Sequence, residues 1–266
     1  MSVNLPGPVT AYRLQELGAT ILKIEPPHGD PISKKCEPFY KHLVGGQTIL
    51  TLNLKKEEDR AELDTHLQTA DILITATRPG SLKKLNLNWK SLHSQFPQLC
   101  HIALVGYEGA DENHPGHDLN FQAEAGLIRP PHMPVTMMAD LAGAEKAVST
   151  VLAMLLFRGH SGQGTFQKVS LLKALEEFGN PLRYKLNAHG GAVDGSRPEY
   201  GIYSSRDGWI VVGCLEAHFK EKLLELLAPP AWTRAALQDI FLTKTSSEWH
   251  FWGREQELPI SRIKKI

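Results

Sequence analysis

Short apolar segments alternate with helix-like segments along the first half of the chain, and this alternation limits the possible folds more than any other feature. Strands rich in β-branched and aliphatic residues are expected at 19–24, 48–53, 71–76 and 100–105. Helices are expected at 9–17, before the first strand, and at 57–69, where the helix faces solvent. Strands that alternate with helices are typical of βαβ units, whose strands pair in parallel. The pattern predicts an α/β fold with a Rossmann-like open parallel sheet.

The rest of the chain predicts a second, smaller domain. Further helices are expected at 140–157, 170–178, 216–227 and 232–241. Strands at 200–203 and 209–213 flank Arg206-Asp207-Gly208, which is a β-hairpin signal. The stretch before this hairpin is polar and glycine-rich, as linkers often are. We therefore expect a large domain over residues 1–185, a linker over 186–198 and a small α+β domain over 199–266.

Charge and composition argue against several classes of protein. The chain has 29 Lys and Arg and 29 Asp and Glu among 266 residues, so it lacks the basic excess of a nucleic-acid-binding protein. No apolar run approaches the roughly 20 residues of a membrane span, and residues 1–8 do not resemble a signal peptide. Cys36, Cys100 and Cys214 show no CxxC or CxxH spacing. We expect a cytoplasmic protein without nucleic-acid or membrane partners.

Familiar cofactor and metal motifs are absent from the sequence. A GxGxxG motif is missing, so nothing beyond fold analogy favours a nicotinamide cofactor. The histidines show neither HxxxH nor HExxH spacing, so we expect no metal. The aromatic cluster at 249–252 is expected to serve packing. These observations leave a protein with a small-molecule ligand as the expectation.

Several polar residues stand where a site could form. Lys55 and Arg78 each follow an expected parallel strand, where open α/β sheets bind ligands, although both could be solvated surface charges. His117 and Asp118 open a helix whose N-terminus either is capped by Asp118 or could hold an anion. Asp140 begins the long helix and could cap it in the same way.

An ordered set of short motifs resembles one known family. Each motif alone is weakly specific, but together they span about residues 5–220. They are Leu5-Pro6-Gly7-Pro8, Lys23-Ile24-Glu25-Pro26, Gly29-Asp30-Pro31, Leu52-Asn53-Leu54-Lys55, Arg78-Pro79-Gly80-Ser81-Leu82, Gly116-His117-Asp118, Ala139-Asp140-Leu141 and Asp207-Gly208-Trp209. The chain thus resembles the CaiB/BaiF family, the family III CoA-transferases, which also include α-methylacyl-CoA racemases.

The resemblance implies an architecture and a ligand. It implies a large Rossmann-like domain with a smaller one, two chains interlocked as a homodimer, and an acyl-CoA thioester as substrate with no metal or redox cofactor. It places the adenine and phosphates of coenzyme A near residues 52–55 and 75–78. The expected coenzyme A ligands are Leu52, Asn53, Leu54, Lys55, Thr75, Arg78, Leu82, Gly116 and Phe121.

The resemblance also implies two alternative chemistries. In the racemase branch, His117 and Asp140 would remove the α-proton of the thioester and return it on the opposite face; an imidazole suits the base role near neutral pH. In the transferases, the residue matching Asp118 is a nucleophile, and a tyrosine usually stands where this chain has His117. Glu216 matches a glutamate that the small domain presents near the active site, although it could simply begin a helix.

The chain also departs from the family pattern. Relatives carry a β-strand before the Leu-Pro-Gly-Pro turn, whereas only residues 1–4 precede it here, and they continue beyond the equivalent of residue 266. Because His117 stands where the transferases usually carry tyrosine, racemisation of a 2-methylacyl-CoA is the preferred expectation. CoA transfer through Asp118 is one alternative, and a shortened, inactive member that binds coenzyme A is the other.

Overall fold

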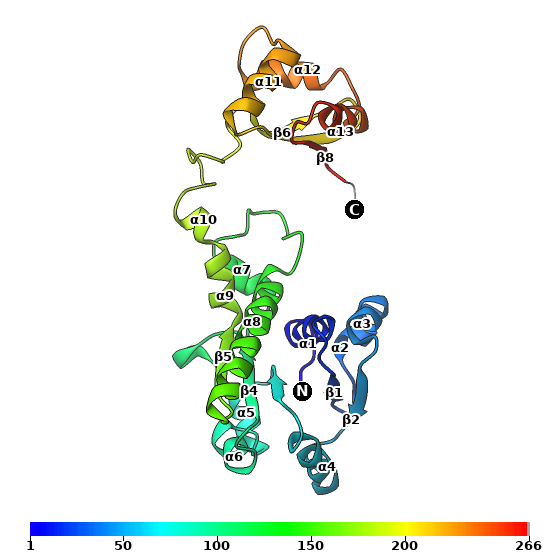
Figure 1. The fold of residues 1–266 in the computed structure, drawn as a ribbon, viewed down its shortest axis with the longest axis vertical. Coiled ribbons are helices and arrows are strands. Elements are labelled where there is room, and N and C mark those ends of the chain that lie inside the picture. The colour runs from blue at the N-terminus through cyan, green and yellow to red at the C-terminus, as the bar shows by residue number, and fades with distance from the viewer. Residues whose placement is uncertain (265–266) are drawn as a thin grey trace. The chain divides into compact units, whose positions relative to one another are not determined.

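The chain divides into two compact units, Met1–Gly179 and Asn180–Ile266, in a computed structural model that describes residues 1–264 (Figure 1). The division falls six residues before the domain end expected at residue 185. Residues 186–198 form turns and bends within the second unit.

The first unit alternates strands and helices, as the sequence pattern predicts. Its elements are α1 (Pro6–Glu16), β1 (Leu22–Glu25), α2 (Pro31–Lys35), α3 (Glu37–Val44), β2 (Thr48–Thr51), α4 (Glu57–Leu67), β3 (Ile72–Thr75), α5 (Pro79–Lys84), α6 (Trp89–Gln95), β4 (Cys100–Val105), the 3-10 turn η1 (Gly109–Asp111), α7 (Asp118–Glu124), α8 (Met138–Ser161), β5 (Phe166–Ser170) and α9 (Leu171–Phe178). Proline stands at the start of α1, α2 and α5, where its missing N–H costs no helical hydrogen bond.

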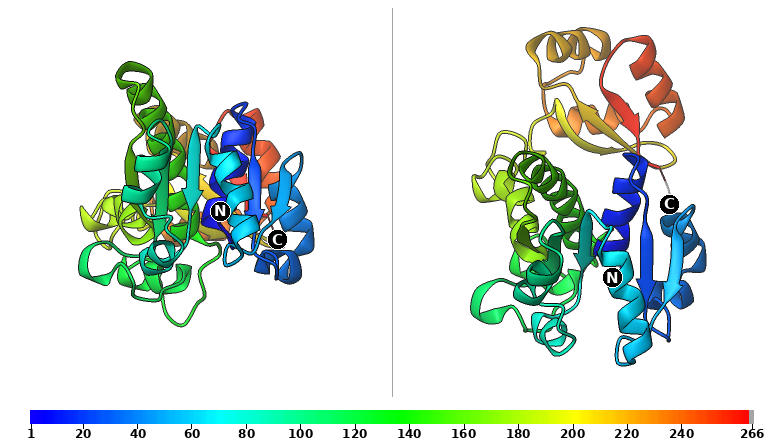
Figure 2. Two further views of the ribbon diagram at one scale, coloured as in Figure 1. Left: turned by 90° about the horizontal axis from the view of Figure 1, so that it is seen from below. Right: turned by 60° about the horizontal axis from the view of Figure 1, so that its bottom comes forward.

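All strand pairs in the first unit are parallel, and this confirms the predicted mixed α/β fold. The strands form two separate sheets among the described residues, β1-β2 and β3-β4-β5, where one open sheet was expected. Figure 2 shows β1 and β2 side by side. β4 is the central strand of the larger sheet, and all six of its residues are buried. The site described below lies beyond its carboxyl end.

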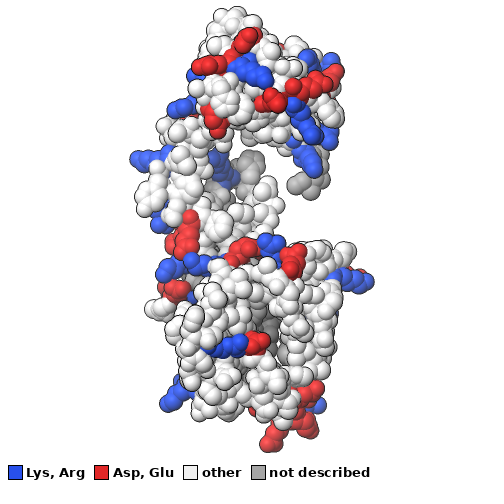
Figure 3. Space-filling model, viewed as in Figure 1, with Lys and Arg blue, Asp and Glu red and all other residues white. Residues whose placement is uncertain are grey.

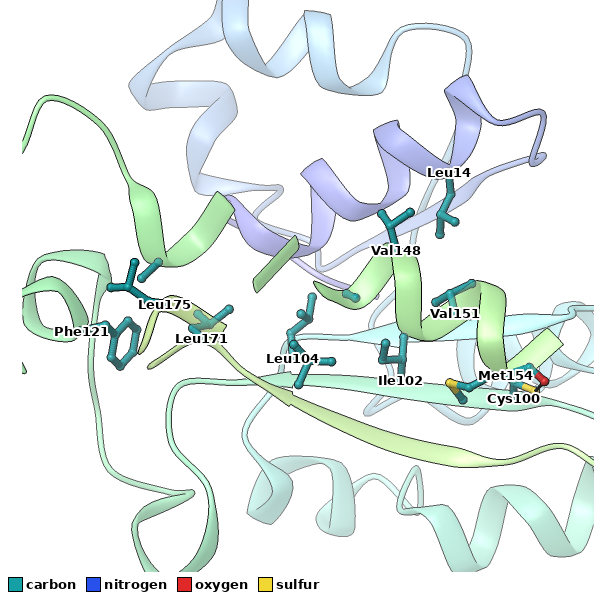
Figure 4. Packing of buried hydrophobic residues seen from close by; sticks show 13 residues of the cluster. Leu14, Cys100, Ile102, Leu104, Phe121, Val148, Val151, Met154, Leu171 and Leu175 are labelled. Atoms are coloured by element: carbon teal, nitrogen blue, oxygen red, sulfur yellow. Dashed lines mark hydrogen bonds between the residues drawn. The ribbon is translucent and has the colours of Figure 1, made fainter. Parts of the chain in front are cut away.

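The long helix α8 packs along the larger sheet and supplies more buried residues to the main core than any other element. Its buried face carries small and medium side chains that contact Ile102 and Leu104 of β4 and Leu171 of α9 (Figure 4). A Cβ atom built on Gly143 would lie 2.2 Å from Leu171 Cδ2, so only glycine permits this approach of α8 to α9. The helix ends at Gly162, which adopts a left-handed conformation (φ 70°) that closes helices at low steric cost.

The second unit has its own core and an antiparallel sheet. Its elements are α10 (Asn180–Arg183), β6 (Tyr200–Ser204), β7 (Trp209–Gly213), α11 (Ala217–Leu227), α12 (Arg234–Phe241), α13 (Ser246–Glu255) and β8 (Ile260–Arg262). β6 and β7 form the predicted hairpin, and β8 joins the other edge of β7. Trp249 is buried in the core of this unit and Trp252 packs against the same core, as expected for the aromatic cluster, whereas Phe251 is exposed.

The sequence analysis missed the shortest elements. Helices α2, α3, α5 and α6 have five to eight residues, too few for a clear 3.6-residue period. Strand β5 carries two exposed polar residues, Gln167 and Lys168, and is held in place by pairing with β4. Strand β5 thus depends on a tertiary contact, whereas each short helix starts at a proline or a capping residue.

Candidate active site

A cavity of about 680 Å³ lies in the first unit, at the carboxyl ends of β3 and β4. Residues that directly follow these strands line it, including Ala76, Arg78 and Gly106. The rest of its wall comes from the N-terminal segment, α2, the first turns of α7 and α8, and the segment before α8. Ligands of parallel α/β sheets bind at this end of the strands, so the cavity is the candidate active site.

Six of the predicted site residues line this one cavity. They are Arg78, Gly116, His117, Asp118, Phe121 and Asp140. Asp140 is 22 residues away from Asp118 in the sequence, and the backbone N–H of Asp140 is hydrogen-bonded to the Asp118 side chain. The fold therefore brings the three chemically reactive candidates, His117, Asp118 and Asp140, to one place.

The carboxylate of Asp118 caps a helix other than its own. Its Oδ1 accepts hydrogen bonds from the backbone N–H groups of Ala139 (2.7 Å) and Asp140 (3.1 Å), at the start of α8. Its Oδ2 accepts a hydrogen bond from Gln122 Nε2 (2.6 Å). The expectation that Asp118 caps α7 is wrong, because His117 is the N-cap residue of α7 and Asp118 is its first helical residue. Asp118 is 9% exposed, and three donors engage its two oxygens.

Asp140 lies in the first turn of α8, and its acidity is strongly perturbed. The alternative that it caps α8 is wrong, since Met137 is the N-cap residue. Burial, reinforced by the negative charge of Asp118, raises the pKa of Asp140 to about 7. Near neutral pH this carboxyl therefore holds a proton for much of the time, as a general acid must.

His117 projects from the loop that enters α7. Its backbone is extended at the N-cap position, and its N–H donates to Oδ1 of Asn120 (3.1 Å), which anchors the start of the helix. The His117 residue is exposed and lines the cavity together with Asp140. An exposed imidazole and a partly buried carboxyl on the wall of one cavity form a pair suited to moving protons.

Two glycines let the backbone close around the ring of Phe121. A Cβ on Gly106 would lie 2.8 Å from Phe121 Cζ, and a Cβ on Gly116 would lie 2.7 Å from Phe121 Cε1. Both distances are shorter than side chains tolerate, so glycine is required for this packing. The ring is almost fully buried and gives the cavity wall an apolar residue.

The other predicted coenzyme A ligands do not line the cavity. Leu52 and Leu82 are buried in the core formed with α4 and α6, and Leu54 packs against the same core. Thr75 is buried too, and its Oγ1 lies 2.9 Å from His101 Nε2. The side chains of these residues take part in packing or in an internal hydrogen bond, and their expected role as coenzyme A ligands stays a prediction. Asn53 and Lys55 lie in the turn after β2, where Asn53 Oδ1 accepts from the Lys55 N–H (3.3 Å).

Glu216 belongs to the second unit. It is exposed and is the N-cap residue of α11, as the alternative interpretation of this residue suggests. Burial, together with the charges of Glu216 and Glu199, raises the pKa of the Cys214 thiol to about 12. Cys214 is therefore held as an unreactive thiol in the core of this unit.

The sequence of the whole chain matches one family model. The model is that of CoA-transferase family III, and it matches residues 1–266. The chain belongs to CoA-transferase family III. The resemblance that the ordered motifs indicate is thereby confirmed, and the chain is a member of a family of enzymes.

Individual family members cover both chemistries. The chain is 25% identical to the α-methylacyl-CoA racemase of Homo sapiens over 92% of this chain and 70% of the racemase. It is 26% identical to a probable fatty acyl-CoA transferase of Mycobacterium tuberculosis over 92% of this chain and 76% of that protein. A crystal structure of a hypothetical protein from M. tuberculosis superposes with a TM-score of 0.86 at 23% identity, covering 99% of this chain and 80% of that one. This likeness shows the fold.

In this family III member, the motifs at residues 23–26 and 29–31 form a buried ionic network. Lys23 Nζ lies 2.8 Å from Asp30 Oδ2 and 3.3 Å from Glu25 Oε1, and all three side chains are buried. Asp30 Oδ1 also accepts from the N–H groups of Asn4 and Ile32, both at 3.1 Å. Asp30 thereby caps α2 and fixes the N-terminal segment, and both of these elements line the cavity.

Sequence reasoning missed two basic residues on the cavity wall, Lys35 and His114. Lys35 ends α2, whose start was marked by an N-cap aspartate followed by proline at Asp30-Pro31, a signal that could have predicted this helix. Nothing in the sequence around His114 indicates its position, because it lies in an irregular loop whose path depends on the surrounding elements.

The described part of the chain contains neither a candidate membrane-spanning helix nor a candidate metal-binding cluster. Within residues 1–264, no helix is long and apolar enough to cross a membrane. The same residues contain no cluster of three His, Cys, Asp or Glu side chains arranged to hold a metal ion. Acidic and basic side chains are interspersed on the face shown in Figure 3.

Proposed function

We propose that this chain acts on acyl-CoA thioesters and inverts the configuration at the α-carbon of a 2-methylacyl group. The observation that supports this most directly is that His117 and a carboxyl with a raised pKa, Asp140, line the same cavity. Inversion needs a base on one face of the substrate and an acid on the other, and the two groups supply both. The similarity to an α-methylacyl-CoA racemase agrees with this reaction.

The proposed reaction is a balanced pair of proton transfers. The imidazole of His117 removes the α-proton, and the electron pair of the C–H bond moves toward the thioester oxygen to give an enolate. Asp140 then donates its proton to the opposite face of the α-carbon, which leaves an aspartate and an imidazolium. The first N–H groups of a helix have no partner within it, and Asp118 and Leu119 at the start of α7 line the cavity. These N–H groups would stabilise the enolate oxygen.

Coenzyme A carries phosphates, and the cavity offers fixed positive charge to receive them. Arg78 lies at the N-cap position of α5 and Lys35 at the end of α2, and both line the cavity. Arginine binds phosphate in a bidentate manner, and lysine contributes a mobile charge. We assign the phosphate-binding role to this pair.

CoA transfer is the alternative chemistry, and the site limits how it could occur. A nucleophilic carboxylate attacks through one of its oxygens, and three hydrogen bonds already engage the oxygens of Asp118. An acyl anhydride at Oδ1 would break the cap of α8, and one at Oδ2 would displace the hydrogen bond from Gln122. In this geometry Asp140 is the carboxyl better placed for a covalent step. The inactive alternative is less well supported, because the cavity keeps both His117 and Asp140.

We also propose that the protein forms a homodimer. The side chains of Leu152, Leu156 and Phe157 on α8 are among the exposed large apolar side chains of the first unit. Apolar surface of this kind is often covered by a partner. Light scattering after size-exclusion chromatography would give about twice the 29.5 kDa of one chain. A monomeric mass would contradict the proposal.

The central experiment measures exchange of the α-proton. The wild-type protein is incubated with 2-methylbutanoyl-CoA and 2-methyloctanoyl-CoA in D₂O, and deuterium at the α-carbon is followed by mass spectrometry. His117→Ala and Asp140→Ala should each slow exchange by about 10²-fold or more, the usual effect of losing a positioned acid or base. His160→Ala, an exposed imidazole at the end of α8, is the control and should leave exchange unchanged.

A second readout separates the two chemistries. Hydroxylamine traps acyl-enzyme intermediates, so labelling that depends on acyl-CoA and disappears in Asp140→Ala or Asp118→Asn would indicate CoA transfer. Labelling without α-exchange would reject the racemase proposal. Binding of coenzyme A with neither reaction would support the inactive alternative.

A further inference from the structure

The two aspartates of the site compete for the same helix end, and only one of them obtains its hydrogen bonds. An acidic residue in the first turn of a helix is normally stabilised as an anion by the unpaired N–H groups there. At α8 the carboxylate of Asp118 occupies the N–H groups of Ala139 and Asp140. Among the hydrogen bonds of the described residues, none involves the carboxyl of Asp140 itself. The carboxyl of Asp140 therefore lies at a helix N-terminus without the hydrogen bonds that usually stabilise an anion there.

Gln122 holds Asp118 in this position. It lies one helical turn after Asp118 in α7 and is only 2% exposed. Its Nε2 donates both to Asp118 Oδ2 (2.6 Å) and to the backbone carbonyl of Thr136 (2.9 Å), just before α8. Both oxygens of Asp118 thus face N–H donors. A proton on either oxygen would point toward a donor and displace a hydrogen bond.

We propose that Gln122 is a positioning residue that decides which carboxyl of the Asp118–Asp140 pair holds the proton. By donating to Asp118, it favours the ionised form of Asp118 and leaves the shared proton on Asp140. The role of this proton in the reaction rests on the proposed function, which needs Asp140 as the acid. When two carboxyls interact this closely, the protons belong to the pair, and a hydrogen-bond donor to one member selects the site of protonation.

Other charged groups near Asp140 do not offer a better explanation. Glu145 and Lys146, further along α8, pair with Arg13 of α1 (2.8 Å) and with Glu177 of α9 (3.3 Å). Lys168 of β5, beside β4, pairs with Glu112. The remaining titratable or charged groups on the cavity wall are Lys35, Arg78, His114 and His117. The basic groups among these would favour an ionised Asp140, whereas Asp118 favours its protonated form, in agreement with the raised pKa of Asp140.

The test is a titration of individual aspartates in the full-length chain without substrate. Aspartate labelled with ¹³C at the side-chain carboxyl is incorporated, and the two signals are assigned from Asp118→Asn and Asp140→Asn. In the wild type, the step near pH 7 should appear in the Asp140 signal alone. In Gln122→Met, which keeps the length but removes the donors, the same step should appear in both carboxyl signals, because the two aspartates then share the proton. The Asp140 signal should lose about a third or more of its amplitude in this step.

The control variant removes equivalent hydrogen bonds elsewhere. Gln47 is also partly buried, and its Nε2 donates to Gln15 Oε1 (3.0 Å) and to the carbonyl of Leu43 (2.9 Å). Gln47→Met should leave both aspartate titrations unchanged. A step near pH 7 that stays confined to the Asp140 signal in folded Gln122→Met, as in the wild type, overturns the proposal. If Gln122→Met does not fold, the Asp118→Asn variant decides, since an unchanged Asp140 midpoint there overturns the proposal as well.

The same variants separate this inference from the proposed function. If the wild type exchanges α-protons, Gln122→Met should exchange more slowly near neutral pH, by the fraction of the proton that the Asp140 signal loses in the titration. If the wild type shows no exchange while the titrations behave as expected, the proposed reaction fails and the assignment of the proton stands. If exchange occurs but the titrations are insensitive to Gln122, the positioning role fails and the reaction stands.

Discussion

Replacing Asp140 by asparagine should make the protein more stable at neutral pH. In the folded chain the pKa of Asp140 is raised from 3.8 to about 7, because the carboxyl is partly buried beside the charge of Asp118. In the unfolded chain the same group loses its proton near pH 4. Asparagine has nearly the same shape and no charge at any pH, so it removes this electrostatic cost and leaves the packing almost unchanged.

The magnitude and sign follow from proton linkage. Between pH 4 and pH 7 the folded state binds more protons at Asp140 than the unfolded state, so the wild type loses stability as the pH rises through this range. A shift of about three pKa units at 1.36 kcal/mol per unit amounts to about 4 kcal/mol. The difference between Asp140→Asn and the wild type should be small near pH 4, rise to about 4 kcal/mol at pH 7 and level off above it.

Urea unfolding followed by circular dichroism at pH 4, 5, 6, 7 and 8 measures this difference. Asp111→Asn serves as the control, because Asp111 is an exposed aspartate of the same unit, and its stability difference should stay near zero throughout. The reasoning is refuted if Asp140→Asn gains less than 1 kcal/mol at pH 7, or if its gain does not depend on pH. Residues in active sites often reduce stability in this way.

Three further predictions concern binding and stability. Arg78→Ala should weaken coenzyme A binding about tenfold or more in calorimetry, since charge-assisted hydrogen bonds contribute about 1.5–3 kcal/mol. Lys55→Ala should have little effect, and equal effects of the two substitutions would contradict the assignment of phosphate binding to the cavity. Asp30→Ala should lower the free energy of unfolding by about 3–5 kcal/mol, because it removes the nearer of the two carboxylates that pair with buried Lys23 and also removes the cap of α2. A loss below about 1 kcal/mol in urea would contradict this role. Burial lowers the pKa of His101 from 6.5 to about 4. The free energy of unfolding of the wild type should therefore fall by about 3 kcal/mol as the pH falls through that interval, and His101→Leu should lack this loss. An equal loss in both proteins would refute this prediction.

Much of the first unit could be predicted because local patterns and tertiary structure agree there. Five of the six residues of β4 are apolar, and the predicted strand matches the observed one, Cys100–Val105. The long apolar helix was expected at 140–157 and observed at Met138–Ser161, with Gly162 as its stop. Strand β5 was missed because its Gln167 and Lys168 give no apolar signal, and its extended form depends on pairing with β4.

The candidate site shows more clearly which features the sequence determines and which depend on the tertiary structure. The residue types and the order of the motifs determined the family, the parallel α/β character and the choice of His117, Asp118 and Asp140. The roles of the two aspartates depended on contacts across 22 residues of sequence, because Asp118 caps α8 and Asp140 does not. A single sequence shows which residues can cap a helix or carry a proton. Which donors they meet, and so which of them stays charged, is set only when the fold brings α7 against α8, since burial and hydrogen bonding are properties of that packing.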